Sequence, residues 1–141
     1  MYLPRHIWFV LVVIMISSCS TETLDVTSPT GKLGVTVEPM EGKAYDKITF
    51  SVNYDGKTIL SQTELGLETD VQKFYGNLKL KSVSKTKRIV DDYKMITGKR
   101  SHCINEAFER TYSFENQEGN TLDITFRVYD NGVVFRYEIN T

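Results

Sequence analysis

The chemistry open to this chain depends first on its carboxylates, because an acid and a base or nucleophile at fixed separation can hydrolyse a glycosidic bond. Two pairs lie close in sequence, Asp91 with Asp92 and Glu106 with Glu109. Adjacent residues on a strand face opposite ways, so we expect Asp91 and Asp92 to lie in a turn. Glu109 follows the apolar Phe108 and fits an outward-facing strand position. Neither pair predicts an active site.

Histidine and cysteine add no nucleophile. His102 stands alone beside Cys103, and on a strand the two side chains point to opposite faces. A single cysteine also lacks the companions of a metal site or an internal disulfide. We therefore expect Cys103 to be a small buried apolar residue. G-x-S-x-G, P-loop, H-E-x-x-H and paired C-x-x-C motifs do not occur, and we assign no catalytic, cofactor-binding or metal-binding residue.

The second cysteine, Cys19, follows a segment typical of exported proteins. Arg5 precedes an unbroken apolar run over residues 7–16, which is too short to span a bilayer but suits the h-region of a signal peptide. The string ISSC at residues 16–19 resembles a bacterial lipobox, whose cysteine becomes lipidated. We expect residues 1–18 to be a lipoprotein signal peptide, Cys19 to carry the lipid and residues 19–23 to form a tether. An ordinary secretory signal cleaved nearby is the alternative.

A lipid on Cys19 would anchor the mature protein to a membrane without spanning it. Ser20 stands after the cysteine, with no Asp there, which resembles outer-membrane sorting. We therefore expect the periplasm or outer membrane of a Gram-negative bacterium. Removal of Arg5 with the signal leaves 16 basic and 18 acidic residues, a net charge of −2. That balance argues against nucleic acid or an anionic surface as the partner.

The elements that would position any site are β-strands. Residues 122–139 give the clearest pattern, because two alternating apolar and polar runs flank the turn Asp130-Asn131-Gly132. Asp55-Gly56 is a second strong hairpin signal. The expected strands cover residues 24–28, 32–37, 48–54, 57–60, 107–115, 122–129 and 133–139.

The middle of the chain has weaker patterns. Residues 65–67 are compatible with a short strand, the polar residues 69–77 with a turn of helix, and residues 79–95 with weak alternation. The basic run at residues 85–88 indicates a solvated strand face or a hairpin tip, because Asp91 and Asp92 follow it. Short strands at this spacing, about eight to ten of them, predict an all-β, antiparallel β-sandwich preceded by the N-terminal signal segment.

A sugar-binding module usually presents an aromatic platform. The one tryptophan, Trp8, lies in the expected signal. Phe74-Tyr75, Tyr45 and Tyr93 lie in less regular segments and are the candidates for exposed rings. Alternating aromatic residues elsewhere in the chain are more often core residues, so the pattern favours packing over an independent carbohydrate platform.

Four strings resemble the N-terminal domain of glycoside hydrolase family 97. LDVTSPTGKL at residues 24–33 resembles that domain's opening strand and turn, with Thr30 where the family favours Asp or Asn. YDGKTIL at 54–60 with LGL at 65–67, and GKR at 98–100 with Asn105-Glu106, resemble two further segments. FRVYDNGVVFRYE at 126–138 resembles the family most closely.

The resemblance implies a β-sandwich that is part of a galactose-mutarotase-like super-sandwich, here over residues 24–141 and incomplete. Members of the family are α-glucosidases and α-galactosidases, often calcium-dependent, whose catalytic carboxylates and most calcium ligands lie in a (β/α)8 barrel. No catalytic or calcium-binding role therefore transfers to a residue of this chain. Arg127 and Arg136 would be structural, paired with Asp123, Glu138 or carboxylates of neighbouring strands.

Two functions remain open from the sequence. In the first, the chain is the N-terminal sandwich of a glycan-degrading enzyme and packs on a catalytic barrel, with carbohydrate as the partner of the whole enzyme. In the second, it is a self-sufficient surface lipoprotein that binds a glycan or a partner protein. An incomplete sandwich would leave open edges and uncovered apolar faces, so the first function predicts marginal stability for the piece alone.

Overall fold

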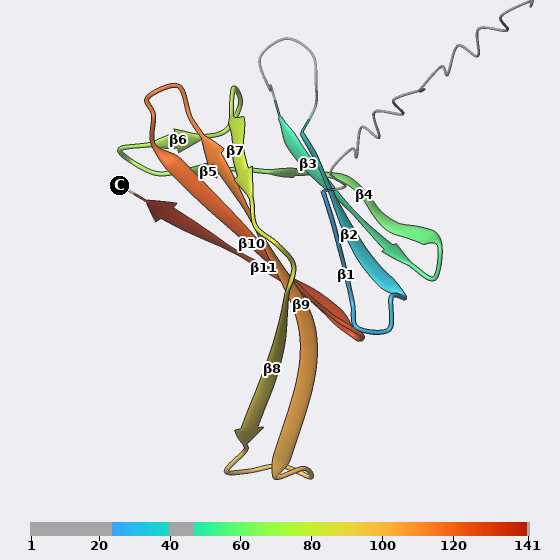
Figure 1. Ribbon diagram of the computed structural model, residues 1–141. Helices are drawn as coiled ribbons and strands as arrows, with labels where there is room; N and C mark the ends of the chain where they lie inside the picture. Colours follow the sequence, from blue (N-terminus) through green and yellow to red (C-terminus); the bar gives the residue numbers. More distant parts are fainter. Residues whose placement is uncertain (1–23, 40–46, 141) are drawn as a thin grey trace, which may run out of the picture.

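The computed structural model describes residues 24–39 and 47–140. All regular elements in these ranges are strands, which confirms the all-β, antiparallel prediction (Figure 1). The expected signal peptide, Cys19, the tether, Trp8 and Tyr45 lie outside the described residues. Within them, no helix is long and apolar enough to cross a membrane. The strands are β1 (Asp25–Thr27), β2 (Leu33–Pro39), β3 (Ile48–Tyr54), β4 (Lys57–Leu65), β5 (Leu67–Glu68), β6 (Lys73–Phe74), β7 (Lys79–Val83), β8 (Lys87–Lys94), β9 (His102–Glu115), β10 (Thr121–Tyr129) and β11 (Gly132–Asn140).

The first sheet is a meander in the order β1-β2-β3-β4, with antiparallel neighbours. The predicted turn between β3 and β4 is confirmed: Asp55 and Gly56 both adopt positive φ, 47° and 75°. Strand β4 continues past the predicted end at Leu60 to Leu65. The register shifts between Phe50 and Val52, and the Gln62 N–H donates to Ser51 Oγ at 3.2 Å. This irregularity disrupts the alternation, which explains the early predicted end.

The second sheet has the order β11-β10-β9-β7, and β8 also pairs with β9. Strand β10 pairs with residues 107–115 of β9, whereas β8 pairs with residues 102–109. The five residues 102–106 therefore have a sheet neighbour on one side only. We call β8 and residues 102–109 of β9 the arm; Figure 1 shows its distal half leaving the sandwich as a two-stranded ribbon.

The core lies between the two sheets, as the alternation predicts. Phe50 of the first sheet packs on Phe126 of the second, with ring centroids 5.3 Å apart. The other large side chains that are fully buried come from both sheets and from the segment that joins them. They include Val26, Val35, Val37, Ile48, Phe74, Leu78, Tyr112, Phe114, Leu122, Ile124 and Val128.

The two sheets meet closely where β1 contacts β9 and β10, and we call this the closed side. The Tyr112 hydroxyl, fully buried on β9, donates to Leu24 O at 2.7 Å. Arg110 Nη1 donates to Asp25 O at 2.9 Å, and its Nε donates to Ser84 O at 3.1 Å. Burial raises the pKa of Tyr112 well above its ordinary value, so the phenol stays neutral there.

The opposite, open side lies between the edge strands β4 and β11. One interaction bridges the strand ends there: the Gly66 N–H donates to the Tyr137 hydroxyl at 3.2 Å. Farther along, Ile59 is 64% exposed and Phe135 is 44% exposed, although Phe135 contacts the core ring of Phe126. Apolar side chains that contact the core are thus accessible to solvent on this side.

Several local predictions are wrong. Residues 69–77 contain no helical turn; β5 and β6 form a short hairpin whose loop is held by reciprocal bonds between Thr69 and Gln72. This pair brings the described strands to eleven, above the predicted number. Asp91 and Asp92 lie within β8, not in a turn. Cys103 is half-buried on the arm instead of fully buried, because only β8 flanks β9 at this position.

Candidate functional site

Glu106 and Glu109, one of the two carboxylate pairs close in sequence, are each held by an arginine. Glu106 and Glu109, three residues apart on β9, point to opposite faces. Arg88 Nη2 lies 2.7 Å from Glu106 Oε2, and Arg127 Nη2 lies 2.6 Å from Glu109 Oε2. Glu106 and Glu109 are therefore not brought together. Each is already paired with an arginine, so neither is available as an acid or base.

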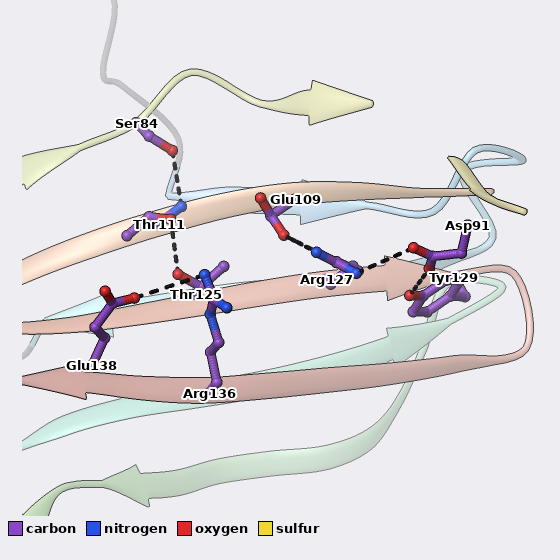
Figure 2. Close-up of polar contacts among 9 residues, drawn as sticks. All are labelled: Ser84, Asp91, Glu109, Thr111, Thr125, Arg127, Tyr129, Arg136 and Glu138. Carbon is purple, nitrogen blue, oxygen red and sulfur yellow. Dashed lines mark hydrogen bonds and ion pairs between the residues drawn. The ribbon is translucent and has the colours of Figure 1, made fainter. Parts of the chain in front are cut away.

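A polar ladder joins the arm to the sheet (Figure 2). Arg127 on β10 contacts Glu109 on β9 and reaches Asp91 on β8, with Nη1 3.5 Å from Asp91 Oδ1. The Tyr129 hydroxyl donates to Asp91 Oδ2 at 2.6 Å. Hydrogen bonds to Tyr129 and Glu109 raise the pKa of Arg127, while burial raises the pKa of Tyr129. This arrangement keeps the Arg127 guanidinium charged and the Tyr129 phenol neutral. Its role is therefore to attach the arm to the sheet, not to transfer a proton.

The prediction that both arginines pair with carboxylates is confirmed. Arg127 pairs with Glu109 and Asp91, and Arg136 Nη2 lies 3.7 Å from Glu138 Oε2. Asp123 is not a partner of either arginine. It accepts hydrogen bonds from Ser113 Oγ and Asn140 Nδ2 at 2.5 and 2.8 Å.

His102 does not stand alone, because its Nε2 lies 2.5 Å from Asp92 Oδ1 across the arm. Its neighbour Cys103 faces the other way and pairs in register with Tyr93. The expectation that His102 is no base for Cys103 fits this geometry. In residues 24–39 and 47–140, no group of three or more His, Cys, Asp or Glu side chains is arranged to hold a metal ion.

Segments that resemble the family are connected in space. The Thr30 N–H and hydroxyl donate to Asp130 Oδ1 at 3.0 and 2.6 Å, joining the β1–β2 turn to the β10–β11 turn. These bonds from Thr30 lower the pKa of the Asp130 carboxyl. Gly66, from the LGL string, donates to Tyr137 of the terminal strand. The motifs therefore connect the two sheets at separate points.

Several concave regions are open to ligands or partners among the described residues, and two of them differ clearly in chemistry. An apolar cleft of about 570 Å³ occupies the open side, and its lining is Leu33, Val52, Tyr54, Ile59, Leu60 and residues 130–133. A polar cavity of about 370 Å³ lies near the β5–β6 hairpin and the β9–β10 turn, and its lining is residues 69–73, 75–77 and 116–118. Sequence reasoning identified neither region, since each is assembled from segments distant in the chain.

The candidate aromatic platform residues differ in exposure. Phe74 is completely buried and belongs to the core, which is contrary to the expected exposure. Tyr75 is 55% exposed and lines the polar cavity. Tyr93 is 46% exposed on the arm, away from that cavity. Tyr75 and Tyr93 therefore both combine exposure with a neighbouring polar concave region, because Tyr93 lines a separate one on the arm with Asp91, Asp92 and Asn105.

Comparison with known proteins places these features in context. The family model described as "Glycosyl-hydrolase 97 N-terminal" matches residues 26–141. A probable retaining alpha-galactosidase of Streptomyces bingchenggensis is 25% identical over 115 residues, which cover 82% of this chain and 18% of that protein.

Solved structures show the same fold. The crystal structure of a beta-arabinopyranosidase is 37% identical with a TM-score of 0.73, covering 80% of this chain and 17% of that one. A glycoside hydrolase family 97 enzyme from Pseudoalteromonas sp. strain K8, in complex with panose, is 24% identical with a TM-score of 0.71, covering 82% and 17%. This chain thus spans less than a fifth of these relatives. On the family match and the shared fold, the chain belongs to the glycosyl-hydrolase 97 N-terminal family.

Proposed function

We propose that this chain serves as the N-terminal β-sandwich of a glycan-degrading glycoside hydrolase and packs on a catalytic domain outside these 141 residues. The observation that carries the proposal is the open side, where apolar side chains next to the core face solvent. Ile59, Leu60 and Tyr54 of the first sheet and Phe135 of the second are all more than a third exposed. Contiguous apolar surface of this kind marks an interaction site.

The described carboxylates also suit a supporting role. Asp91 and Glu109 contact Arg127, Glu106 contacts Arg88, and Asp92 contacts His102. Such pairing leaves these groups poorly placed to exchange protons with a substrate. In the proposed enzyme, substrate turnover belongs to the catalytic domain, and the sandwich contributes by packing and by walling the sugar pocket.

A chimera tests the packing. This chain would replace the matched N-terminal part of the beta-arabinopyranosidase relative, to which it is 37% identical. We expect the chimera to unfold cooperatively and to bind little of an apolar fluorescent dye, whereas the chain alone binds the dye strongly. A chimera that binds as much dye as the chain alone would count against the proposal. Reading the gene beyond codon 141 gives an independent test, because barrel-coding sequence is expected there.

We further propose that the protein is exported and anchored through a lipid on Cys19, in the periplasm or outer membrane of a Gram-negative bacterium. The support is the lipobox-like string at residues 16–19 behind an apolar run. Labelled palmitate is expected to enter the protein and to be lost in Cys19→Ala. Equal labelling of the variant would refute the anchor.

The second candidate function is a self-sufficient surface lipoprotein that binds a glycan or a partner protein. The polar cavity beside Tyr75 is the observation that favours it. A stop codon after residue 141 followed by an unrelated gene would support this function over the first.

A further inference from the structure

We propose that the polar cavity between the β5–β6 hairpin and the β9–β10 turn is a binding site for an uncharged saccharide. The choice of a saccharide as the ligand rests on the proposed function. The cavity itself and the residues that line it are independent of that proposal. Its volume, about 370 Å³, is sufficient for a small sugar. This site would be additional to the active site of any catalytic domain.

The lining of the cavity favours a ligand with many hydroxyl groups. Amide side chains come from Gln72 and Asn77 on one wall and from Gln117 on the other. An amide offers both donors and acceptors, and so does a hydroxyl. Asp70 adds an acceptor that matches the same groups.

Other ligand classes fit less well. Lys73 is already paired with Glu68 at 2.8 Å, so the cavity has no cluster of unpaired cations for an anion. In the described part of the chain, no carboxylates gather in a metal-binding arrangement. Apolar ligands would prefer the cleft of the open side, whose walls are Leu33, Val52 and Ile59. A neutral polar ligand remains.

Tyr75 supplies an aromatic wall that is held in place at two points. Its hydroxyl donates to Glu64 Oε2 at 2.7 Å, and Glu64 Oε1 is bound by Lys47 Nζ at 2.6 Å. The ring lies against Gly66, where an added Cβ would come within 2.8 Å of Tyr75 Cδ2. Glycine at position 66 therefore permits this ring position. A fixed ring next to hydrogen-bonding groups is suited to stacking with the apolar face of a pyranose, without a large loss of side-chain entropy on binding.

The opposite wall is also ordered before any ligand binds. Asn116 Oδ1 accepts bonds from the Glu118 and Asn120 N–H groups at 3.1 and 2.9 Å. Asn116 Nδ2 donates to Lys73 O at 3.3 Å, which ties the β9–β10 turn to β6. The exposed side chain of Gln117 lies at the tip of this turn and lines the cavity.

The test measures saccharide binding by the 141-residue chain fused to thioredoxin, which keeps it in solution, with thioredoxin alone as the blank. Panose, melibiose and maltotriose are the probes, and saturation-transfer NMR and calorimetry are the measurements. We expect at least one probe to bind, with a dissociation constant on the order of 1 mM. Tyr75→Ala should weaken binding about tenfold or more, and Gln117→Ala about threefold.

Tyr93→Ala is the matched control, because Tyr93 is similarly exposed but lies on the arm. It should leave the affinity unchanged. Gln117 is an exposed turn residue, so Gln117→Ala keeps the fold intact even if Tyr75→Ala does not. Absence of binding by all three probes, or binding that neither variant weakens, would overturn the site. Either result leaves the chimera experiment unaffected, so failure of this site is distinguishable from failure of the proposed function.

Discussion

The closed and open sides of the sandwich contain similar residue types but bury them differently. On the closed side, Tyr112 is fully buried and its hydroxyl and the Arg110 guanidinium both donate to backbone carbonyls of the β1 region. On the open side, Phe135 contacts Phe126 in the core but remains 44% exposed. Among the described residues, the Gly66–Tyr137 hydrogen bond links the strand ends there.

The difference shows that apolar content alone does not complete a core. Strand β1 has only three residues, yet it closes one side because β9 side chains reach the backbone oxygens of Asp25 and of Leu24, which precedes the strand. Strand β4 has nine residues and leaves the other side open, since Ile59 and Leu60 find no opposing layer among the described residues. The open side is thus the surface on which a further layer or domain would bury the most apolar area.

The largest effect is expected from truncating the aromatic residue on the closed side. Tyr112→Ala should lower the free energy of unfolding by about 3–5 kcal/mol, because it creates a cavity and removes the bond to Leu24 O. Phe135→Ala on the open side should lower it by only about 1 kcal/mol, since much of that ring already contacts water. Urea unfolding followed by circular dichroism measures both. Equal losses would contradict the distinction between the two sides.

The sequence predicts the sandwich well where alternation and turn chemistry agree. Residues 122–139 follow the period of two, and Leu122, Ile124, Phe126 and Val128 are all completely buried as their pattern requires. The Asp55-Gly56 hairpin is equally regular because both residues tolerate positive φ. These features depend on local physics and are visible in a single chain.

The arm and the polar cavity were not predictable in the same way. Val90 and Ile104 are exposed on the arm, so its strands lack the buried face that makes alternation informative. The cavity combines residues 69–77 with residues 116–118, and no local pattern reports that these turns meet. Arg127 was correctly expected to pair with a carboxylate, but its contact with Asp91 required knowledge that β8 lies beside β9.

The second largest loss of stability is expected where the arm is attached to the sheet, a region that belongs to neither the closed nor the open side. Arg127→Met leaves Glu109 and Asp91 without their cation and should lower the free energy of unfolding by about 1–2 kcal/mol. Backbone amides of β8 should exchange faster with deuterium, whereas those of β2 should not. Arg136→Met is the control, because Arg136 is exposed and its contact with Glu138 is long, at 3.7 Å. A uniform increase across both sheets would mean that the ladder supports the whole sandwich.

A smaller effect separates the hydroxyl of Tyr112 from its ring. Tyr112→Phe should cost about 1 kcal/mol near neutral pH, because Leu24 O loses the shorter of its two hydrogen bonds and keeps the one from the Val37 N–H. The pKa of Tyr112 is raised in the folded state, so its contribution is complete below the unfolded pKa of about 10 and is lost as pH rises above it. The stability of Tyr112→Phe should therefore fall less steeply above pH 10 than that of the unsubstituted chain. Parallel alkaline curves would show that this phenol does not control the loss.

The smallest effect on stability is expected on the open side. Ile59 is 64% exposed, so Ile59→Lys should change the free energy of unfolding of the chain by less than about 0.5 kcal/mol. The same substitution should reduce self-association measured by light scattering, because a charge on β4 opposes edge pairing and burial of the apolar cleft. Thr58→Lys is the matched control, because it places the same charge on the same strand but replaces a polar side chain. It should change self-association less. A residue that contributes little to stability but strongly to association is what a docking surface requires, whereas a residue such as Tyr112 has the opposite profile. If Ile59→Lys destabilised the chain as much as a core substitution does, the open side would have to be regarded as part of a finished core.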